Sequence, residues 1–369
     1  MSVERHFRTC PLCEATCGLE VTVRDGAVER IRGDAEDVFS HGFLCPKGVS
    51  LSELHEDPDR LRTPLRRAGD GFEPVSWDEA FALVDEGLGR VLADGQRDAV
   101  GLYLGNPNAH NLSSLLYGRV LVKALGSRNV YSASTVDQYP KQLASAYLFG
   151  SPTTVAVPDL DRCAWLLILG ANPAASNGSL MTAPDARGRL QGIRSRGGRV
   201  VVVDPRRSRT AELADEHVAV IPGTDALLLF AMVGVLFDEG LVSVGRLEPH
   251  VAGVEAVGEL AADFSPEAVA PVCGVDADVI RRLARELAAA PSGCVYGRIG
   301  TTTQAFGTLT SWLVDVLNVL TGNLDRAGGA MFPHPASHNG QVMNATVSAI
   351  CPSCQEIGPP AAFAADMEG

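Results

Sequence analysis

Three uninterrupted apolar runs, at residues 164–169, 199–203 and 218–221, dominate the middle of the chain. Such runs predict strands that are buried on both faces, because a strand with one face in water alternates apolar and polar residues. Stretches with helical spacing separate these runs, and residues 184–196 are one of them. The alternation predicts an α/β protein with a doubly wound, mostly parallel, Rossmann-like sheet.

Other patterns predict further elements. Apolar residues recur at helical spacing over residues 77–92, and the apolar stretches 226–237 and 312–320 predict buried helices. Residues 100–105 predict a buried strand that leads into a polar loop and a helix. A strand, a polar loop and a helix in this order commonly form a ligand-binding turn in α/β proteins.

Four cysteines near the N-terminus form the most specific motif. Cys10, Cys13 and Cys17 follow C-x2-C-x3-C spacing, and Cys45 comes later in the chain. Between Cys17 and Cys45, alternating apolar residues flank the turn dipeptide Asp25-Gly26, which predicts a β-hairpin. We expect this hairpin to return the chain so that all four thiolates surround one metal centre.

Two kinds of metal centre suit four thiolates. A zinc site is usually built from two close pairs of ligands, and Cys45 has no close partner in the sequence. An iron–sulfur cube needs one thiolate for each of its irons, which suits three clustered cysteines and one distant cysteine. The spacing favours a [4Fe-4S] cluster, and the alternatives are a zinc ion or cysteines that bind no metal.

Polar loops follow each of the three apolar runs. In a parallel sheet, ligands bind beyond the carboxyl ends of the strands, so we expect these loops to converge on one crevice. Glycines there permit close approach of a backbone, amide and hydroxyl groups form hydrogen bonds, carboxylates accept from guanine or ribose, and arginine pairs with phosphate. The alternative is that these are ordinary turns, which use the same residue types. The candidate residues are Gly170, Asn172, Ser176, Asp204, Arg206, Gly223 and Asp225.

Composition narrows the range of functions. The 369 residues are 46% hydrophobic and can build more than one core. The formal net charge of −13 argues against nucleic-acid binding, which requires basic surface. No apolar run reaches membrane-spanning length and no signal-like segment precedes Cys10, so we expect a cytoplasmic protein. Cys163, Cys273 and Cys294 lie singly in apolar surroundings and are expected in the core.

The order of these motifs resembles the molybdopterin oxidoreductase family of formate dehydrogenases and nitrate reductases. The resemblance rests on the cysteine run, on Lys47 two residues after Cys45, and on the segments Gly170-Ala-Asn-Pro173 and Asp204-Pro-Arg206. It implies a molybdenum or tungsten bis-molybdopterin guanine dinucleotide whose guanine end occupies the loops. It further implies that Lys47 relays electrons between pterin and cluster, and that a redox partner protein or subunit receives them.

The resemblance also bears on residues 297–307, which precede the helix predicted at 312–320. It implies that Gly300 and Gln304 lie where the loop approaches the second pterin; the alternative is a structural turn.

The segment that carries the metal ligand in this family departs from its usual pattern. Lys141 stands at the position of an arginine, and Leu143 stands where the family places a cysteine, selenocysteine, serine or aspartate. Leucine cannot ligate a metal. Either Asp137 or Ser145 ligates through a shifted register, or the metal is held by pterin and solvent alone.

The resemblance fades after Pro335. A close pair, Cys351 and Cys354, could bind zinc with His334 or His338, although a tail of this kind is more often disordered. Members of the family are generally longer, with further domains that complete the cofactor site. We divide the chain into a cluster domain at 1–60, a Rossmann-like cofactor domain at 131–299, an α/β domain at 61–130 plus about 300–335, and a tail at 336–369.

Three functions remain open. The first is a formate-dehydrogenase-like oxidoreductase that acts on a small-molecule substrate and passes electrons between a pterin-bound metal and a [4Fe-4S] cluster. The second is a truncated, non-catalytic electron-transfer or assembly protein. The third is a zinc-stabilised nucleotide-binding module.

Overall fold

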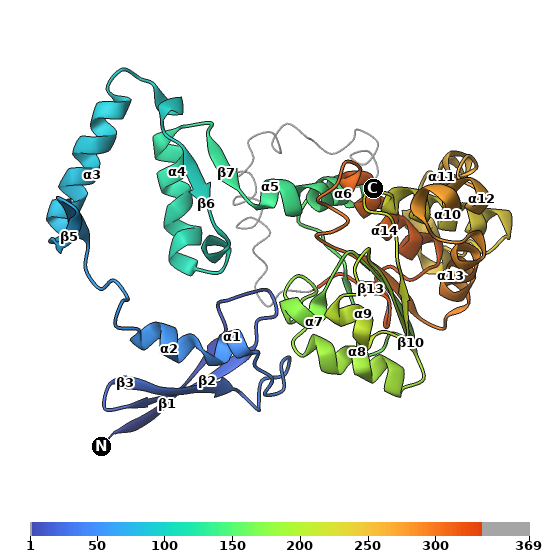
Figure 1. The fold of residues 1–369 in the computed structure, drawn as a ribbon, viewed down its shortest axis with the longest axis horizontal. Helices are drawn as coiled ribbons and strands as arrows, with labels where there is room; N and C mark the ends of the chain where they lie inside the picture. Colours follow the sequence, from blue (N-terminus) through green and yellow to red (C-terminus); the bar gives the residue numbers. More distant parts are fainter. Residues whose placement is uncertain (1, 334–369) are drawn as a thin grey trace. The chain divides into compact units, whose positions relative to one another are not determined.

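The computed structural model describes residues 2–333. They form two compact units, one up to Ser132 and one from Ala133 onward, each considered by itself below (Figure 1).

The first unit begins with a three-stranded antiparallel sheet in the order β1-β2-β3. The predicted hairpin is confirmed, because β2 and β3 pair around Asp25 and Gly26, both of which have positive φ. The additional strand β1 pairs along the whole of β2. Two short helices follow the sheet. The bounds are β1 (Val3–Thr9), β2 (Gly18–Arg24), β3 (Ala27–Gly33), α1 (Pro46–Val49) and α2 (Leu51–Glu56).

The remainder of the first unit contains a hairpin, two helices and a short parallel strand pair. The helix predicted at 77–92 is confirmed as α3, where the Ser76 hydroxyl accepts a hydrogen bond from the Glu79 backbone nitrogen. The expectation of a buried strand at 100–105 is corrected: β6 pairs only with β7, and Tyr103 is 71% exposed. The bounds are β4 (Leu65–Ala68), β5 (Gly71–Pro74), α3 (Trp77–Leu92), β6 (Leu102–Leu104), α4 (Arg119–Leu125) and β7 (Val130–Ser132).

A four-stranded parallel sheet in the order β11-β10-β9-β12 forms the centre of the second unit. The first two predicted strands are confirmed. The third is corrected from 218–221 to β11, because Val218 makes the last pair with β10 and the Ile221 nitrogen donates to the Cys273 carbonyl instead. The bounds are β9 (Trp165–Leu169), β10 (Arg199–Val203), β11 (Glu216–Val218) and β12 (Gly293–Gly297).

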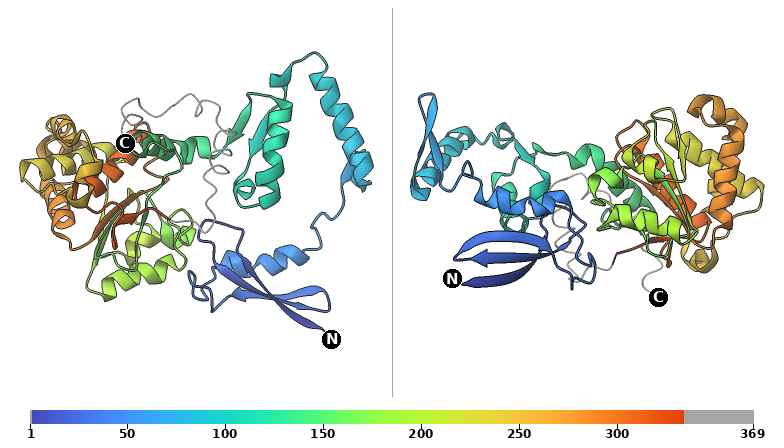
Figure 2. Two further views of the ribbon diagram at one scale, coloured as in Figure 1. Left: turned by 180° about the vertical axis from the view of Figure 1, so that it is seen from behind. Right: turned by 60° about the horizontal axis from the view of Figure 1, so that its bottom comes forward.

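Helices cover both faces of this sheet (Figure 2). Leu166 and Ile168 of β9 pack with α8 on one face, while Leu167 and Leu169 pack with α10, α13 and α14 on the other. The predicted doubly wound arrangement is therefore confirmed. The bounds are α7 (Pro173–Ser176), α8 (Ala186–Ser195), α9 (Arg209–Leu213), α10 (Asp225–Asp238), α11 (Val254–Ala261), α12 (Pro266–Cys273), α13 (Ala277–Ala289) and α14 (Gly307–Leu320).

Helix α14 belongs to the second unit, which changes the expected grouping of residues 300–335 with 61–130. Its Asn318 side chain accepts from the Val295 nitrogen at 2.9 Å and donates to the Val295 carbonyl at 2.9 Å, so it satisfies the open edge of β12. The helix also packs against α6 and α10. The remaining bounds are α5 (Ser134–Asp137), α6 (Tyr139–Phe149), β8 (Val157–Pro158) and β13 (Ala330–Met331).

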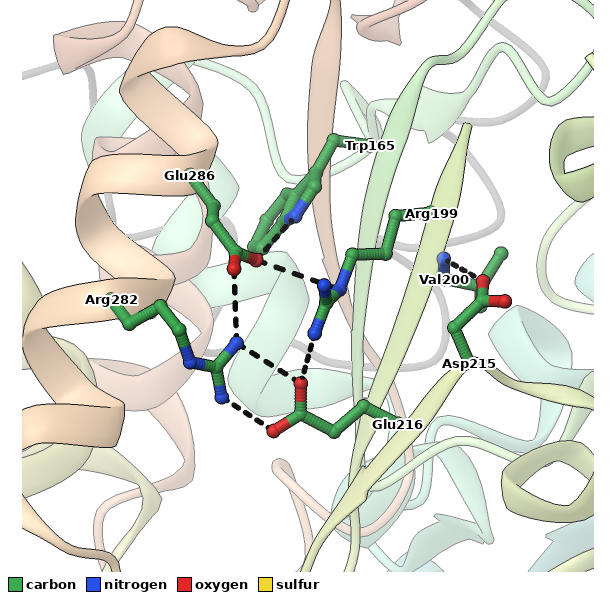
Figure 3. A network of polar contacts seen from close by, with 7 residues as sticks. All are labelled: Trp165, Arg199, Val200, Asp215, Glu216, Arg282 and Glu286. Carbon is green, nitrogen blue, oxygen red and sulfur yellow. Dashed lines mark hydrogen bonds and ion pairs between the residues drawn. The ribbon is translucent and has the colours of Figure 1, made fainter. Parts of the chain in front are cut away.

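A charged network joins the amino ends of three parallel strands to α13 (Figure 3). Glu216 of β11 accepts from Arg282 of α13 and from Arg199 of β10. Glu286 accepts from Arg282 at 3.0 Å and from the Trp165 ring nitrogen of β9 at 3.1 Å. Because ligands of parallel sheets bind at the opposite, carboxyl edge, we interpret this network as structural.

Candidate functional site

The four N-terminal cysteines lie around one loop. Cys10, Cys13 and Cys17 occupy the connection between β1 and β2, and Cys45 directly precedes α1. The Cys10 nitrogen donates to the Cys17 carbonyl at 2.8 Å, which closes the loop, and Thr16 adopts a positive φ within it. The local backbone therefore gathers the three clustered thiols on a single turn.

Burial and mutual repulsion disfavour bare thiolates at this place. Burial raises the pKa of the Cys17 thiol to about 11, and the Coulomb interactions with Cys10, Cys13 and Cys45 add to the shift. These interactions place the four sulfur atoms within electrostatic range of one another. A metal centre would supply the positive charge that stabilises four thiolates together. The residues present therefore fit a thiolate-bound metal centre.

The spacing of the thiols bears on the kind of centre. Within residues 2–333, no three Cys, His, Asp or Glu side chains gather closely enough to hold a single metal ion. A [4Fe-4S] cluster binds one thiolate on each iron, so its ligands lie further apart than those of one ion. Lys47 is exposed on α1, and its charge acts to lower the pKa of the Cys10 thiol. The structure thus places Lys47 within electrostatic range of the cysteines.

The second candidate site lies at the carboxyl edge of the parallel sheet. Of the four strands in this sheet, β9 comes first in the sequence and β12 comes last, yet the two are neighbours. The chain connections therefore diverge between β9 and β12. Crevices of this kind are the usual ligand sites of open α/β sheets. Gly170 follows β9 and Gly300 follows β12, and a Cβ atom at Gly170 would lie 2.9 Å from the Gly300 Cα atom. Only glycine allows the two loops to approach so closely.

Three of the predicted residues, Gly170, Asn172 and Ser176, border a cavity of about 290 Å³ beside these loops. Ser176 is exposed at the end of α7. The Asn172 side-chain oxygen accepts from the Thr210 hydroxyl at 2.8 Å and from the Thr210 nitrogen at 3.2 Å. Asn172 therefore ties the loop to α9, a structural role that the sequence did not reveal.

The loops after β11 and β12 meet at a polar corner. Asp225 is buried at the start of α10 and accepts a hydrogen bond from the Gln304 side-chain nitrogen at 3.0 Å, while the Gln304 oxygen is buried without a partner. Burial raises the pKa of Asp225, and repulsion from Asp204 adds to it. Gly223 lies beside Gln304. The structure therefore brings four of the predicted residues together.

The structure places Arg206 in the neighbouring turn. Its backbone nitrogen donates to the Asp204 carboxylate at 2.8 Å, while its guanidinium is exposed. Arg206 is thus available to a ligand.

The sequence did not single out Arg298, which directly follows β12. It is buried, donates to the Gln138 side-chain oxygen, and borders the cavity described above. The adjacent Thr302 hydroxyl donates to the Asp137 carbonyl at 2.8 Å. The only sequence signal that could have identified Arg298 is its position as a charged residue directly after a buried strand.

The segment expected to carry a metal ligand includes α5 and α6. The buried Lys141 forms an ion pair with the buried Asp315 of α14, so it acts as a tie between helices. Ser145 is 0% exposed and its hydroxyl lacks a partner. Asp137 lies at the end of α5 with one carboxylate oxygen buried and without a partner, and burial raises its pKa. Both candidate ligands thus carry an unpaired oxygen.

Two family models match this chain. Residues 8–56 match the molybdopterin oxidoreductase Fe4S4 domain, and residues 60–354 match the molybdopterin oxidoreductase family. The chain belongs to the molybdopterin oxidoreductase family. This membership supports a [4Fe-4S] cluster in residues 8–56 and a molybdenum or tungsten pterin in residues 60–354.

Individual relatives are 26% to 29% identical to this chain over the matched residues. It is 26% identical to the F420-dependent formate dehydrogenase subunit alpha of Methanocaldococcus jannaschii, covering 90% of this chain and 48% of the relative. It is 29% identical to formate dehydrogenase H of Escherichia coli, covering 90% and 46%, and 28% identical to a nitrate reductase of Symbiobacterium thermophilum, covering 88% and 44%. The chain spans about half the length of these relatives.

Among solved structures, acetylene hydratase from Pelobacter acetylenicus has the same fold. The TM-score is 0.78 at 23% identity, and the match covers 94% of this chain and 47% of the hydratase.

Across residues 2–333, no helix combines the length and apolar character needed to cross a membrane. Cys351, Cys354, His334 and His338, which the sequence raised as zinc ligands, lie outside the described residues.

Proposed function

We propose that this chain is the cofactor-binding part of a formate-dehydrogenase-like oxidoreductase. It would pass electrons between a molybdenum or tungsten bis-molybdopterin guanine dinucleotide and the [4Fe-4S] cluster. The observation that carries the proposal is the joint presence of the four-cysteine loop and the glycine-lined crevice in one member of this family. The formate dehydrogenases among the relatives support formate as the substrate. Nitrate is the alternative substrate, because a nitrate reductase is also among the relatives.

The bound pterin metal would supply a two-electron redox centre. The chain's own residues hold and orient that cofactor. Gly170 and Gly300 let the two loops that border the crevice approach each other, and Arg206 would pair with the cofactor's phosphate groups. Asp225 presents a buried carboxylate to the guanine N–H groups, and Gln304 holds that carboxylate in place.

The cysteines Cys10, Cys13, Cys17 and Cys45 hold the cluster. Lys47, whose charge lowers the pKa of the Cys10 thiol, would stabilise the reduced cluster and relay electrons between pterin and cluster. A separate redox protein or subunit would receive the electrons. We place the protein in the cytoplasm.

The test is metal analysis and an activity assay on protein purified without oxygen from its natural host. We expect about four irons per chain, stoichiometric molybdenum or tungsten, and formate-dependent reduction of a viologen dye. Nitrate-dependent oxidation of reduced dye without formate activity would replace the proposed substrate class. Zinc without iron would overturn the cluster assignment.

A second candidate function is a non-catalytic electron-transfer or assembly protein. Leu143 favours it, because a hydrocarbon side chain stands where the family resemblance expects the metal ligand. Full iron content without molybdenum or tungsten in the natural protein would support this candidate over the first.

A further inference from the structure

Arg298 is a buried cation with unused hydrogen-bonding capacity. The residue is 5% exposed, and its Nε–H group has no hydrogen-bond partner. One terminal nitrogen donates to the neutral side chain of Gln138. None of the ion pairs found among residues 2–333 involves Arg298. A guanidinium in this state is costly, because it has lost water without gaining a contacting anion.

The carboxylates near Arg298 do not form a hydrogen bond or ion pair with it. Asp315 is within electrostatic range but is already paired with Lys141. Asp137 is also within range, yet its buried oxygen makes no hydrogen bond. These groups balance the charge of Arg298 at a distance and leave its Nε–H group open.

Arg298 borders a cavity of suitable size. The cavity of about 290 Å³ has Arg298, Ile299, Gly170, Asn172 and Ser176 among its lining residues. A ligand in this cavity therefore lies beside a buried arginine. Arginine presents its N–H groups as a planar fork that matches two oxygens of a carboxylate, nitrate or phosphate group.

We propose that Arg298 binds an oxyanion group in this cavity. The proposal rests on the proposed function for the location of the crevice and adds the ligand chemistry at its inner end. The oxyanion has two sources, a phosphate group of the cofactor or a small free anion such as formate or nitrate. Both use the same contacts with the guanidinium.

The test uses the iron-loaded chain prepared without pterin cofactor. Pyrophosphate, formate and nitrate are titrated by calorimetry at constant ionic strength maintained with chloride. We expect saturable binding by the wild type and at least tenfold weaker binding by Arg298→Met. The matched control is Arg187→Met, which removes an exposed arginine of α8 and should bind these anions like the wild type.

The order of affinities identifies the source. Pyrophosphate binding at least tenfold tighter than formate and nitrate assigns the site to a cofactor phosphate, and the reverse order assigns it to a small free anion. Equal binding by the wild type and Arg298→Met, or no saturable binding by the wild type, overturns the proposal. If Arg298→Met does not fold, hydrogen exchange of the wild type decides the matter. Anion binding must then protect amides within residues 298–302, and unchanged exchange there rejects the site.

The outcome is separable from that of the proposed function. Cofactor loading with unchanged anion binding in Arg298→Met leaves the oxidoreductase proposal intact and removes only the anion site. Anion binding at Arg298 in a natural protein that lacks molybdenum and tungsten supports the anion site and removes the oxidoreductase proposal.

Discussion

The Gly300 nitrogen donates a hydrogen bond to the Gly170 carbonyl at 2.9 Å, which joins the loops that follow the first and fourth strands of the parallel sheet. Gly170 has a positive φ of 54°, whereas Gly300 is not in that region. A Cβ atom on Gly300 would lie 2.8 Å from the Gly170 Cα atom. The closeness of two backbones, and not the conformation of Gly300, therefore requires glycine at this position.

Gly300→Ala is expected to force the two loops apart. Overpacking of this kind typically costs about 1–3 kcal/mol, and the moved loops should also weaken binding of the pterin cofactor. Urea unfolding and cofactor content measure the two effects. Gly87→Ala in α3, where an added methyl group meets nothing within 4 Å, is the control and should not lose stability. Equal stability of the two variants would show that the loops adjust freely.

Cys17→Ser is expected to remove the iron–sulfur cluster and to disorder the N-terminal sheet, because binding free energy at such sites is also folding free energy. Iron analysis and visible absorbance check this. Cys163→Ser is the matched control, since Cys163 is also buried and its thiol donates to the Trp165 carbonyl at 3.2 Å in the core of the second unit. It should keep full iron content. Retention of the cluster in Cys17→Ser would exclude this thiol as a ligand.

Lys47→Met is expected to lower the reduction potential of the cluster on the order of tens of millivolts without loss of iron. The ammonium group stabilises the more negative, reduced cluster, so its removal favours the oxidised form. Redox titration followed by electron paramagnetic resonance measures the shift. Lys47→Arg keeps the charge and should keep the potential. Loss of iron from Lys47→Met would point to a structural role instead.

Glu216→Gln is expected to reduce stability at pH 7 by about 1 kcal/mol, a modest value because the pair is partly exposed. Burial acts to raise the pKa of Glu216, but the hydrogen bonds from Arg282 and Arg199 outweigh it and hold this pKa below its usual range. The wild type therefore has the full contribution above about pH 4.3 and loses it as the pH falls through the lowered pKa.

Thermal unfolding across this pH range tests the prediction for Glu216. The difference between Glu216→Gln and the wild type should narrow at acid pH. Glu29→Gln, which breaks the exposed pair with Arg24, should have a smaller effect at every pH. A constant difference down to pH 3 would contradict the linkage.

Asp225→Asn is expected to stabilise the cofactor-free chain at pH 7 while weakening guanine nucleotide binding. Burial raises the pKa of Asp225, so the folded state disfavours the charged carboxylate. That cost develops as the pH rises through the ordinary aspartate range, near 3.9, and is complete above the raised pKa. The asparagine oxygen can still accept from Gln304. Unfolding at pH 7 and calorimetry with guanosine diphosphate check both effects, and a destabilised variant would show that the carboxylate is needed for the fold.

The sequence by itself determined the local elements and the metal-binding motif. The runs that form β9 and β10 and the helices α3 and α10 follow from apolar spacing, which depends on neighbouring residues only. The spacing of Cys10, Cys13 and Cys17 is likewise a local property of one loop. Polar loops after buried strands also allowed Gly170 and Asp225 to be chosen in advance, whereas Gln304 was chosen from the family resemblance.

Only the tertiary structure decided which of these loops meet. Periodicity contains no information on strand order, and the position of β12 beside β9 brings Gly300 against Gly170. The same long-range packing ends β11 at Val218, draws the Asn172 oxygen to Thr210, and buries Arg298 without an anion. Each of these depends on contacts between residues far apart in the sequence, which a local pattern does not encode.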